Sequence, residues 1–329
     1  MTPAERFIAR VRRRLSALQP EAASAYLRGL RILVEWAGKR DVERAVSVAY
    51  STARTVGAGA LPVAMDDALR PLMTDGVIDA AFSRFRAVTQ GAVGDGVMYF
   101  ARDVPGAQRF DVNVNFGVLQ PRVVEAIRTM DDRVTERLRG EVRASYRGIM
   151  EQAYVDGIGP RQAAGRVRHL LGLAPNELRQ VANFRAALSG KDGRDWRTYT
   201  ARDRRYDRTI AKALQGGGLT PERIDAMVEA YARKRLALSA EAHARTTMLN
   251  ASKAGQQASW QSAVDQGIID GSLLSKEWIT VGDSKVRPDH VEMRGEVAAF
   301  DQPYSNGQVV PGESEWNCRC WSRIFARRA

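Results

Sequence analysis

The stretch of sequence that decides the fold class, residues 121–157, reads PRVVEAIRTMDDRVTERLRGEVRASYRGIMEQAYVDG. Pro121 suits the first turn of a helix, and Gly157 suits a C-terminal cap. Gly140 and Gly148 weaken a helix by about 1 kcal/mol each without ending it. A helix of about 30 residues, roughly 45 Å long, is therefore predicted. Its apolar face recurs every three or four positions, at Val123, Ile127, Met130, Val134, Leu138, Val142, Tyr146, Ile149 and Ala153.

Shorter helices are predicted to follow this one. Gly and Pro residues bound two of them, over 160–172 and 175–189. A third begins at Pro221, where Thr, Pro and Glu form a helix start. We expect a further helix to begin at Ser239 and to end near Gly267.

The first part of the chain also predicts helices. Residues 1–60 show helical spacing, with a new helix expected to start at Pro20. Glycines and prolines over 56–120 favour short helices joined by loops. Residues 110–116 alternate apolar and polar side chains, which predicts either a strand or an extended arm packed on another subunit.

The last sixty residues predict a small α+β unit. Residues 277–281 and 319–325 are typical of strands, 288–293 of one or two helical turns, and Asn306-Gly307 of a hairpin turn. The fold class is thus mainly α with a small C-terminal α+β domain. The predicted domains are a helical N-terminal region (1–120), a helical domain with the long helix (121–270) and the α+β domain (271–329).

Composition favours an anionic partner. The formal net charge is +12 and the pI is about 10.1, so DNA is the expected partner. No apolar run approaches the roughly 20 residues of a membrane helix, so no membrane partner is expected. The 2 cysteines are separated by one residue and form no disulfide framework, which favours synthesis in a cytoplasm that keeps thiols reduced.

A basic excursion over 191–212 is the candidate DNA-binding segment. It interleaves aromatic residues with arginines, as contacts to a phosphate backbone and to bases require. Binding to double-stranded DNA would be sequence-independent, since no base-reading motif accompanies it. The alternative is a polar excursion between two helices, because four Asp residues offset half of the charge. The candidate contacts are Arg194, Arg197, Arg202, Arg204, Arg205 and Arg208.

Four side chains near the C-terminus are candidate metal ligands: Asp283, His290, Cys318 and Cys320. Zn²⁺ accepts such a mixed N, S and O set. The alternative is a buried reduced cysteine pair, because Cys-x-Cys is tighter than the usual Cys-x2-Cys spacing. No cofactor is required, and a bound zinc ion would be structural, since no general base stands beside it.

The same region resembles a known family. The order Trp278-Ile-Thr, Asp283, Arg287, His290, Gly295 and Asn317-Cys-Arg-Cys is similar to the C-terminal signature of phage minor head proteins, the Mu F-like head morphogenesis family. The long helix, the Gly-Pro break and the short helix ending in Leu-Gly-Leu resemble the family's central part. The resemblance covers roughly residues 110–329.

The resemblance implies a phage minor capsid protein rather than an enzyme. Such a protein is assembled into the procapsid in few copies, in the head interior near the portal vertex of the virion. It would contact the portal and other head proteins and assist head assembly and DNA packaging or ejection. The alternative is a metal-dependent nuclease or hydrolase centred on the four candidate ligands. The sequence has no Gly-rich phosphate loop, His-Glu-x-x-His motif or nucleophile elbow.

Overall fold

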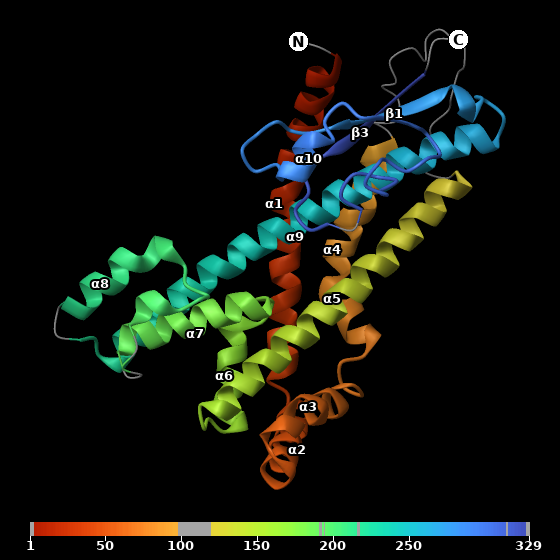
Figure 1. Cartoon of the computed structure of the whole chain (residues 1–329). Coiled ribbons are helices and arrows are strands. Elements are labelled where there is room, and N and C mark those ends of the chain that lie inside the picture. Colours follow the sequence, from red (N-terminus) through yellow and green to blue (C-terminus); the bar gives the residue numbers. More distant parts are fainter. Residues whose placement is uncertain are drawn as a thin grey trace. The chain divides into compact units, whose positions relative to one another are not determined.

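The computed structural model describes residues 3–97, 120–190, 193, 195–215, 218–313 and 315–326, and these are predominantly helical (Figure 1). The predicted class, mainly α with a small C-terminal α+β region, is confirmed. The α-helices are α1 (Pro3–Ala37), α2 (Arg40–Val56), α3 (Leu61–Leu69), α4 (Asp75–Asp95), α5 (Pro121–Val155), α6 (Pro160–Leu170), α7 (Pro175–Ser189), α8 (Asp207–Gln215), α9 (Pro221–Asp265) and α10 (Pro288–Glu292). The strands are β1 (Leu274–Ile279), β2 (Val297–Ala299) and β3 (Trp321–Ala326).

The chain forms two compact units, each assembled from stretches that are far apart in the sequence. The first unit contains Met1–Tyr26, Ser83–Thr135 and Glu241–Ala329. The second unit contains Leu27–Phe82 and Glu136–Ala240. The division of the sequence into 1–120, 121–270 and 271–329 stays a prediction.

The helix predicted from Pro121 is confirmed as α5. Its apolar face is buried as the spacing predicts, apart from Ile127, which is half-buried. The helix ends just before Gly157, whose φ of +70° a residue with a Cβ rarely adopts. Helices α6 and α7 begin at the predicted prolines, and α7 ends at the left-handed Gly190.

Two predicted helix starts are wrong. Pro20 lies inside α1, which continues through it, and buried side chains on both sides (Val11, Ala23 and Tyr26) offset the lost backbone hydrogen bond. Ser239 lies inside α9, a single helix of 45 residues. No Gly or Pro interrupts α9 between Pro221 and Gly255, so nothing in the backbone ends it there.

Helix α4 is longer than the glycines in its sequence predict. It runs through Gly91 and ends at Asp95. Beyond its end, Gly96 packs so closely on α9 that a Cβ would lie 2.0 Å from the carbonyl oxygen of Ser252. The absence of a side chain therefore permits a close helix approach. The alternating segment 110–116 lies outside the described residues.

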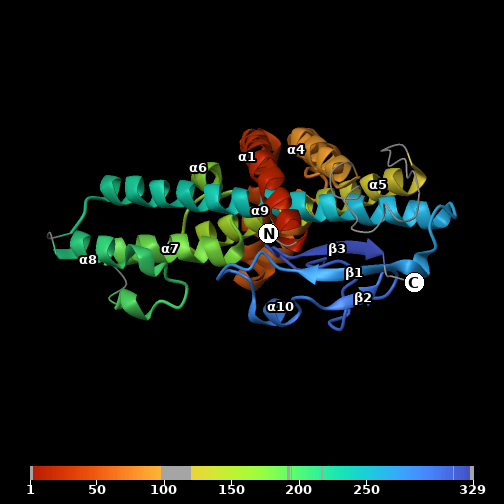
Figure 2. The same ribbon diagram turned by 90° about the horizontal axis from the view of Figure 1, so that it is seen from above.

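The first unit contains a three-stranded antiparallel sheet of order β2-β1-β3 (Figure 2). Ser275 of β1 pairs with Ala299 of β2 on one side and with Phe325 of β3 on the other. Both predicted strands and the short helix α10 are present within a few residues of their predicted bounds. The turn at Asn306-Gly307 is also present, but its flanking residues form no strand, and β2 supplies the third strand instead.

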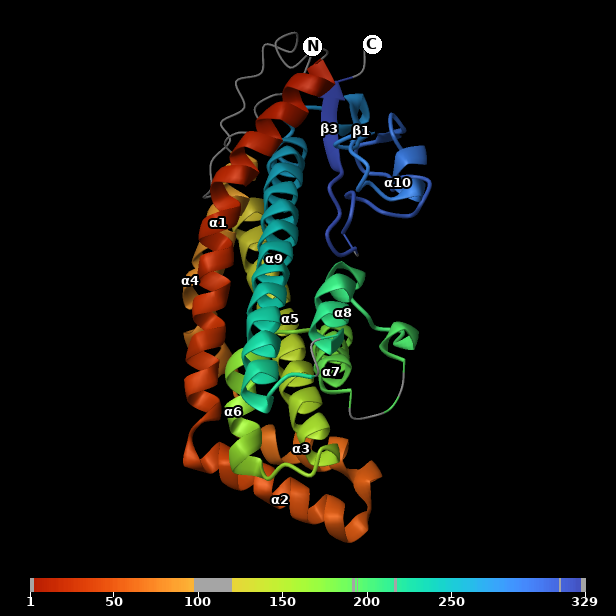
Figure 3. The ribbon, with the colours of Figure 1, turned by 90° about the vertical axis from the view of Figure 1, so that its left-hand side faces the viewer.

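The second unit buries a core between α7, α8 and the part of α9 before Ala240 (Figure 3). Phe184, Ile210 and Tyr231 come from these three helices, and Trp196 joins them from the connection between α7 and α8. This core therefore anchors the basic excursion (191–212) through Trp196 and Ile210. Among the described residues, no helix has the length and apolar character needed to cross a membrane.

Candidate functional site

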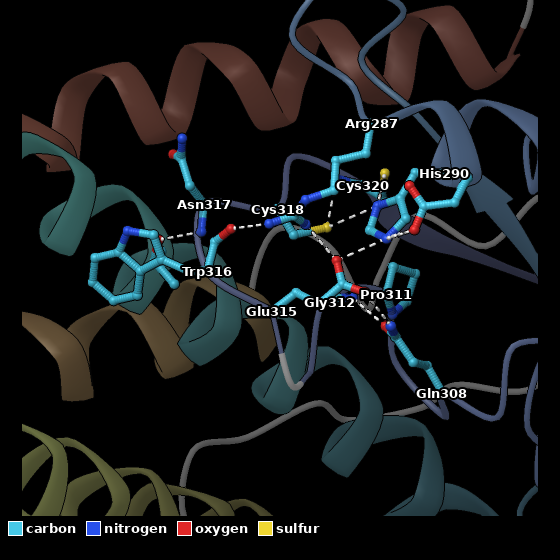
Figure 4. A network of polar contacts seen from close by, with 12 residues as sticks. Arg287, His290, Gln308, Pro311, Gly312, Glu315, Trp316, Asn317, Cys318 and Cys320 are labelled. Carbon is cyan, nitrogen blue, oxygen red and sulfur yellow. Dashed lines mark hydrogen bonds and ion pairs between the residues drawn. The ribbon is translucent and has the colours of Figure 1, made fainter. Parts of the chain in front are cut away.

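Three of the four predicted ligands meet in the first unit. Nδ1 of His290 lies 3.4 Å from Sγ of Cys320 and 3.6 Å from Sγ of Cys318 (Figure 4). The histidine comes from α10, and the cysteines come from the segment directly before β3. All three side chains are buried, with 2%, 4% and 1% exposure for His290, Cys318 and Cys320. We call these three residues the thiol–imidazole cluster.

The opposite nitrogen of the histidine ring faces a carboxylate. Nε2 of His290 lies 2.8 Å from Oε2 of Glu315, whereas Oδ2 of the exposed Asp289 is 3.9 Å away. Arg287 holds Glu315 in place through an ion pair and also donates to the carbonyl oxygen of Trp316 at 2.7 Å. The contact lacks hydrogen-bond geometry, but the negative charge of Glu315 favours the tautomer with the proton on Nε2. This tautomer leaves the Nδ1 lone pair facing the two sulfur atoms.

The loop before Glu315 closes tightly over the cluster. Gly312 has a φ of +73°, and a Cβ there would lie 2.3 Å from Cβ of Cys318. Its backbone N–H donates to Oε1 of Gln308 at 2.6 Å, and Nε2 of Gln308 donates to Glu315 at 2.9 Å. This loop therefore both holds the carboxylate of Glu315 in place and covers Cys318.

A lysine from α9 is buried against the same loop. Nζ of Lys253 donates to the carbonyl oxygen of Pro311 at 2.7 Å. Burial lowers the pKa of this amine, while Cys318 and Cys320 act against that shift. The amine and the two thiols are therefore close enough to influence one another electrostatically.

The two thiols are electrostatically unequal. The hydrogen bond from the Cys320 thiol lowers the pKa of Cys318; burial opposes this shift, and the charge of Lys253 adds to it. The backbone N–H of Cys320 also donates to Sγ of Cys318 at 3.4 Å. Hydrogen bonds of this kind favour the thiolate. The same hydrogen bond raises the pKa of Cys320, which is its donor, and burial adds to this shift.

Asp283, the fourth predicted ligand, does not join the cluster. Its carboxylate forms an ion pair with Arg319 and accepts the backbone N–H of Lys285 at 3.1 Å. Among the described residues, the groups of ligand atoms within 4.8 Å of one another are His290 with the two cysteines, and His290 with Asp289 and Glu315. Arg319 lies between the cysteines in sequence, so the strand-like alternation directs it away from them and toward Asp283.

Helix α9 anchors the cysteine segment from the other side. Asn317 has a left-handed φ of +58°, and its backbone N–H donates to Oγ1 of Thr246 at 3.0 Å. Its side chain accepts from Arg245 at 3.1 Å. Further along, Nε1 of Trp321 donates to Oε1 of Gln256 at 2.8 Å. These contacts set the position of the cysteines that lie between Asn317 and Trp321.

The candidate DNA-binding arginines fall into two groups in the second unit. Arg197, Arg202 and Arg205 form ion pairs with Asp195, Asp207 and Asp203. Arg204 and Arg208 are exposed, without an ion pair to any described residue. Arg194 lies outside the described residues. Local aspartates thus neutralise three of these arginines, and Arg204 and Arg208 remain available among the described ones.

Sequence reasoning missed Glu315, Lys253 and Gly312. Glu315 lies only three residues before Cys318, and this proximity is the one sequence signal that could have identified it. Lys253 is far from the cysteines in the sequence and resembles any other helical lysine. Its burial follows from the tertiary packing of α9.

Comparison with known protein families finds a match for the C-terminal region of the chain. Residues 206–323 match the family described as Phage Mu protein F like protein, which confirms the resemblance over this range. The matched range contains α9, β1, α10, β2 and the whole thiol–imidazole cluster. No curated protein and no solved structure matches the chain.

Proposed function

We propose that the protein is a minor capsid protein of a phage, assembled in few copies into the procapsid. The observation that carries this proposal is the family match over residues 206–323. It lies in the head interior near the portal vertex and assists head assembly and the packaging or ejection of DNA. Its partners are the portal protein and other head proteins, and it assembles in the host cytoplasm.

The proposal includes weak, sequence-independent binding of double-stranded DNA. The net charge of +12 supports an anionic partner. Arg204 and Arg208 supply exposed guanidinium groups that no described carboxylate neutralises. Because such contacts reach phosphates and not base edges, the binding is insensitive to base sequence.

A structural role is favoured over hydrolysis. The hydrolase alternative needs Asp283 together with His290 and the cysteines, but Arg319 and Lys285 engage that carboxylate instead. Incubating purified protein with supercoiled DNA and Mg²⁺, Mn²⁺ or Zn²⁺ tests the alternative. Intact DNA is expected, and multiple-turnover cleavage that purifies with the protein would establish the enzyme.

A nonsense mutation tests the assembly role. A stop codon at Arg40 in the phage that encodes the chain should leave synthesis of the other head proteins unchanged and sharply reduce filled heads. The wild-type chain supplied in trans should restore them. Normal yields of infectious particles without the chain would contradict a role in head assembly.

Cross-linking within purified procapsids tests the position near the portal. Cross-links from this chain should concentrate on the portal protein, despite the large molar excess of the major capsid protein. Particles assembled without portal provide the control, because in them the chain should be depleted. Cross-links spread evenly over the major capsid protein would contradict the proposed position.

A further inference from the structure

We propose that His290, Cys318 and Cys320 bind one zinc ion, through Nδ1 of the histidine and Sγ of each cysteine. This inference goes beyond the proposed head function and does not depend on it. The bound ion would join α10 to the segment before β3, two parts of the chain that share no strand pairing.

The two nitrogen–sulfur distances match a tetrahedral zinc site, and all three ligand atoms lie within 4.8 Å of one another. Zinc lies about 2.0–2.1 Å from imidazole nitrogen and about 2.3 Å from thiolate sulfur, so nitrogen and sulfur on one ion are roughly 3.6 Å apart. The distances from Nδ1 of His290 are 3.6 Å to Cys318 and 3.4 Å to Cys320. An ion can therefore be bound with little movement of the backbone.

The histidine is oriented as a zinc ligand requires. A ligating imidazole commonly gives its second ring nitrogen to a carboxylate, which fixes the tautomer and strengthens the ligand. Glu315 occupies that position, at 2.8 Å from Nε2, and Arg287 and Gln308 hold its two oxygens. Glu315 is thus a positioning residue.

The sulfur side of the histidine is a better zinc site than the carboxylate side. On the carboxylate side, Asp289 is exposed and Glu315 is already engaged by Arg287 and Gln308. On the sulfur side, both cysteines are buried and offer the soft ligands that zinc prefers to water. A zinc ion on the carboxylate side would require Asp289, whereas a zinc ion on the sulfur side would not.

The surroundings balance the charge of the site. Two thiolates and a neutral imidazole neutralise Zn²⁺, and Arg287 neutralises Glu315. The backbone N–H of Cys320 donates to Sγ of Cys318 and stabilises negative charge on that sulfur. The described residues supply three ligand atoms, which leaves the fourth position of the tetrahedron open.

Metal content of the full-length chain tests the proposal. Protein expressed with zinc in the medium should contain about one zinc per chain by elemental analysis. Exchange into Cd²⁺ should produce the ultraviolet charge-transfer absorption of cadmium thiolates, which reports the sulfur ligands without any mutation. Folded wild-type chain that lacks zinc and shows no such absorption would overturn the proposal.

Variants separate the ligands from their neighbours. Cys318→Ser, Cys320→Ser and His290→Gln should each abolish stoichiometric zinc, and Glu315→Gln should weaken zinc affinity by about 10- to 100-fold. Asp289→Asn and Asp283→Asn are the matched controls and should retain full zinc content. Zinc that persists in both cysteine variants, or that requires Asp289 or Asp283, would contradict the assigned ligand set.

Discussion

Nδ1 of His290 and Sγ of Cys320 lie 3.4 Å apart although 30 residues separate them in the sequence. The side chain of Trp278, from β1, packs against both: its ring meets that of His290 edge to face at 5.2 Å, and it shares an apolar cluster with Cys320. A buried polar cluster that packs against Trp278 therefore organises the C-terminal region, and several of the contacts in this region can be tested by substitution.

Gly312→Ala should destabilise the first unit by about 2–4 kcal/mol, because the new methyl group meets Cys318 and the left-handed backbone strains any non-glycine residue. Chemical denaturation followed by Trp fluorescence measures this. Gly307→Ala is the control: Gly307 has a φ of +80° but open space around it, so the variant should lose only about 1 kcal/mol. Equal losses at both positions would mean that Gly312 is not packed on Cys318.

Gly255→Ala should cost about 3 kcal/mol or more, because a Cβ there would lie 2.1 Å from the carbonyl oxygen of Val93. Thermal unfolding monitored by circular dichroism measures this. The matched variant Gly91→Ala lies in α4 with nothing within 4 Å, and should stabilise the protein by about 0.5–1 kcal/mol. A harmless Gly255→Ala would show that α4 and α9 do not approach closely.

Lys276 should make stability increase with pH. Burial lowers its pKa from 10.5 to about 8, and the nearby Asp301 and Glu313 only partly oppose this. The folded state therefore binds fewer protons than the unfolded state between pH 8 and 10.5, so the free energy of unfolding rises over that window by on the order of 2–3 kcal/mol.

Lys276→Met isolates this contribution, since other groups also titrate above pH 8. Denaturation at pH 7.5, 9 and 10 should show a smaller rise for the variant than for the wild type. The variant also loses the hydrogen bond from Nζ of Lys276 to the carbonyl oxygen of Val309. This loss lowers the stability of the variant at every pH and does not change the slope of its pH profile. Parallel pH profiles for the two proteins would contradict a buried amine with a lowered pKa.

Arg204→Gln with Arg208→Gln should weaken DNA binding and reduce the slope of log affinity against log salt by about 2, since two phosphate contacts are lost. Fluorescence anisotropy with a labelled duplex between 50 and 200 mM salt measures the slope. Arg197→Gln with Arg205→Gln is the charge-matched control and should change it less, because aspartates already pair with these residues. Should both double variants keep the wild-type slope, the DNA contact lies elsewhere.

Local sequence signals predicted much of the fold. The apolar spacing after Pro121 and the left-handed glycines after α5 and α7 act through nearby backbone geometry, so α5 and α7 could be predicted from their own residues. The uninterrupted helices through Pro20 and Ser239 could not, because packing along the whole of α1 and α9 decides them.

The residues of the candidate site were also predictable only where the signal is local in the sequence. Residue type and spacing identified His290, Cys318 and Cys320, since these side chains are rare in the chain. They also suggested Asp283, although a carboxylate near Arg319 forms an ion pair as readily as it binds a metal. Lys253 was not predicted, since its burial depends on how the loop at Pro311 meets α9.

The composition of purified particles tests the central claim most directly. Quantitative mass spectrometry of procapsids and mature virions should find this chain at a small, reproducible number of copies relative to the major capsid protein. Virions treated with nuclease and washed in high salt should retain it, which excludes adsorbed protein. Absence of the chain from procapsids and mature virions alike would contradict its proposed role as a minor capsid protein.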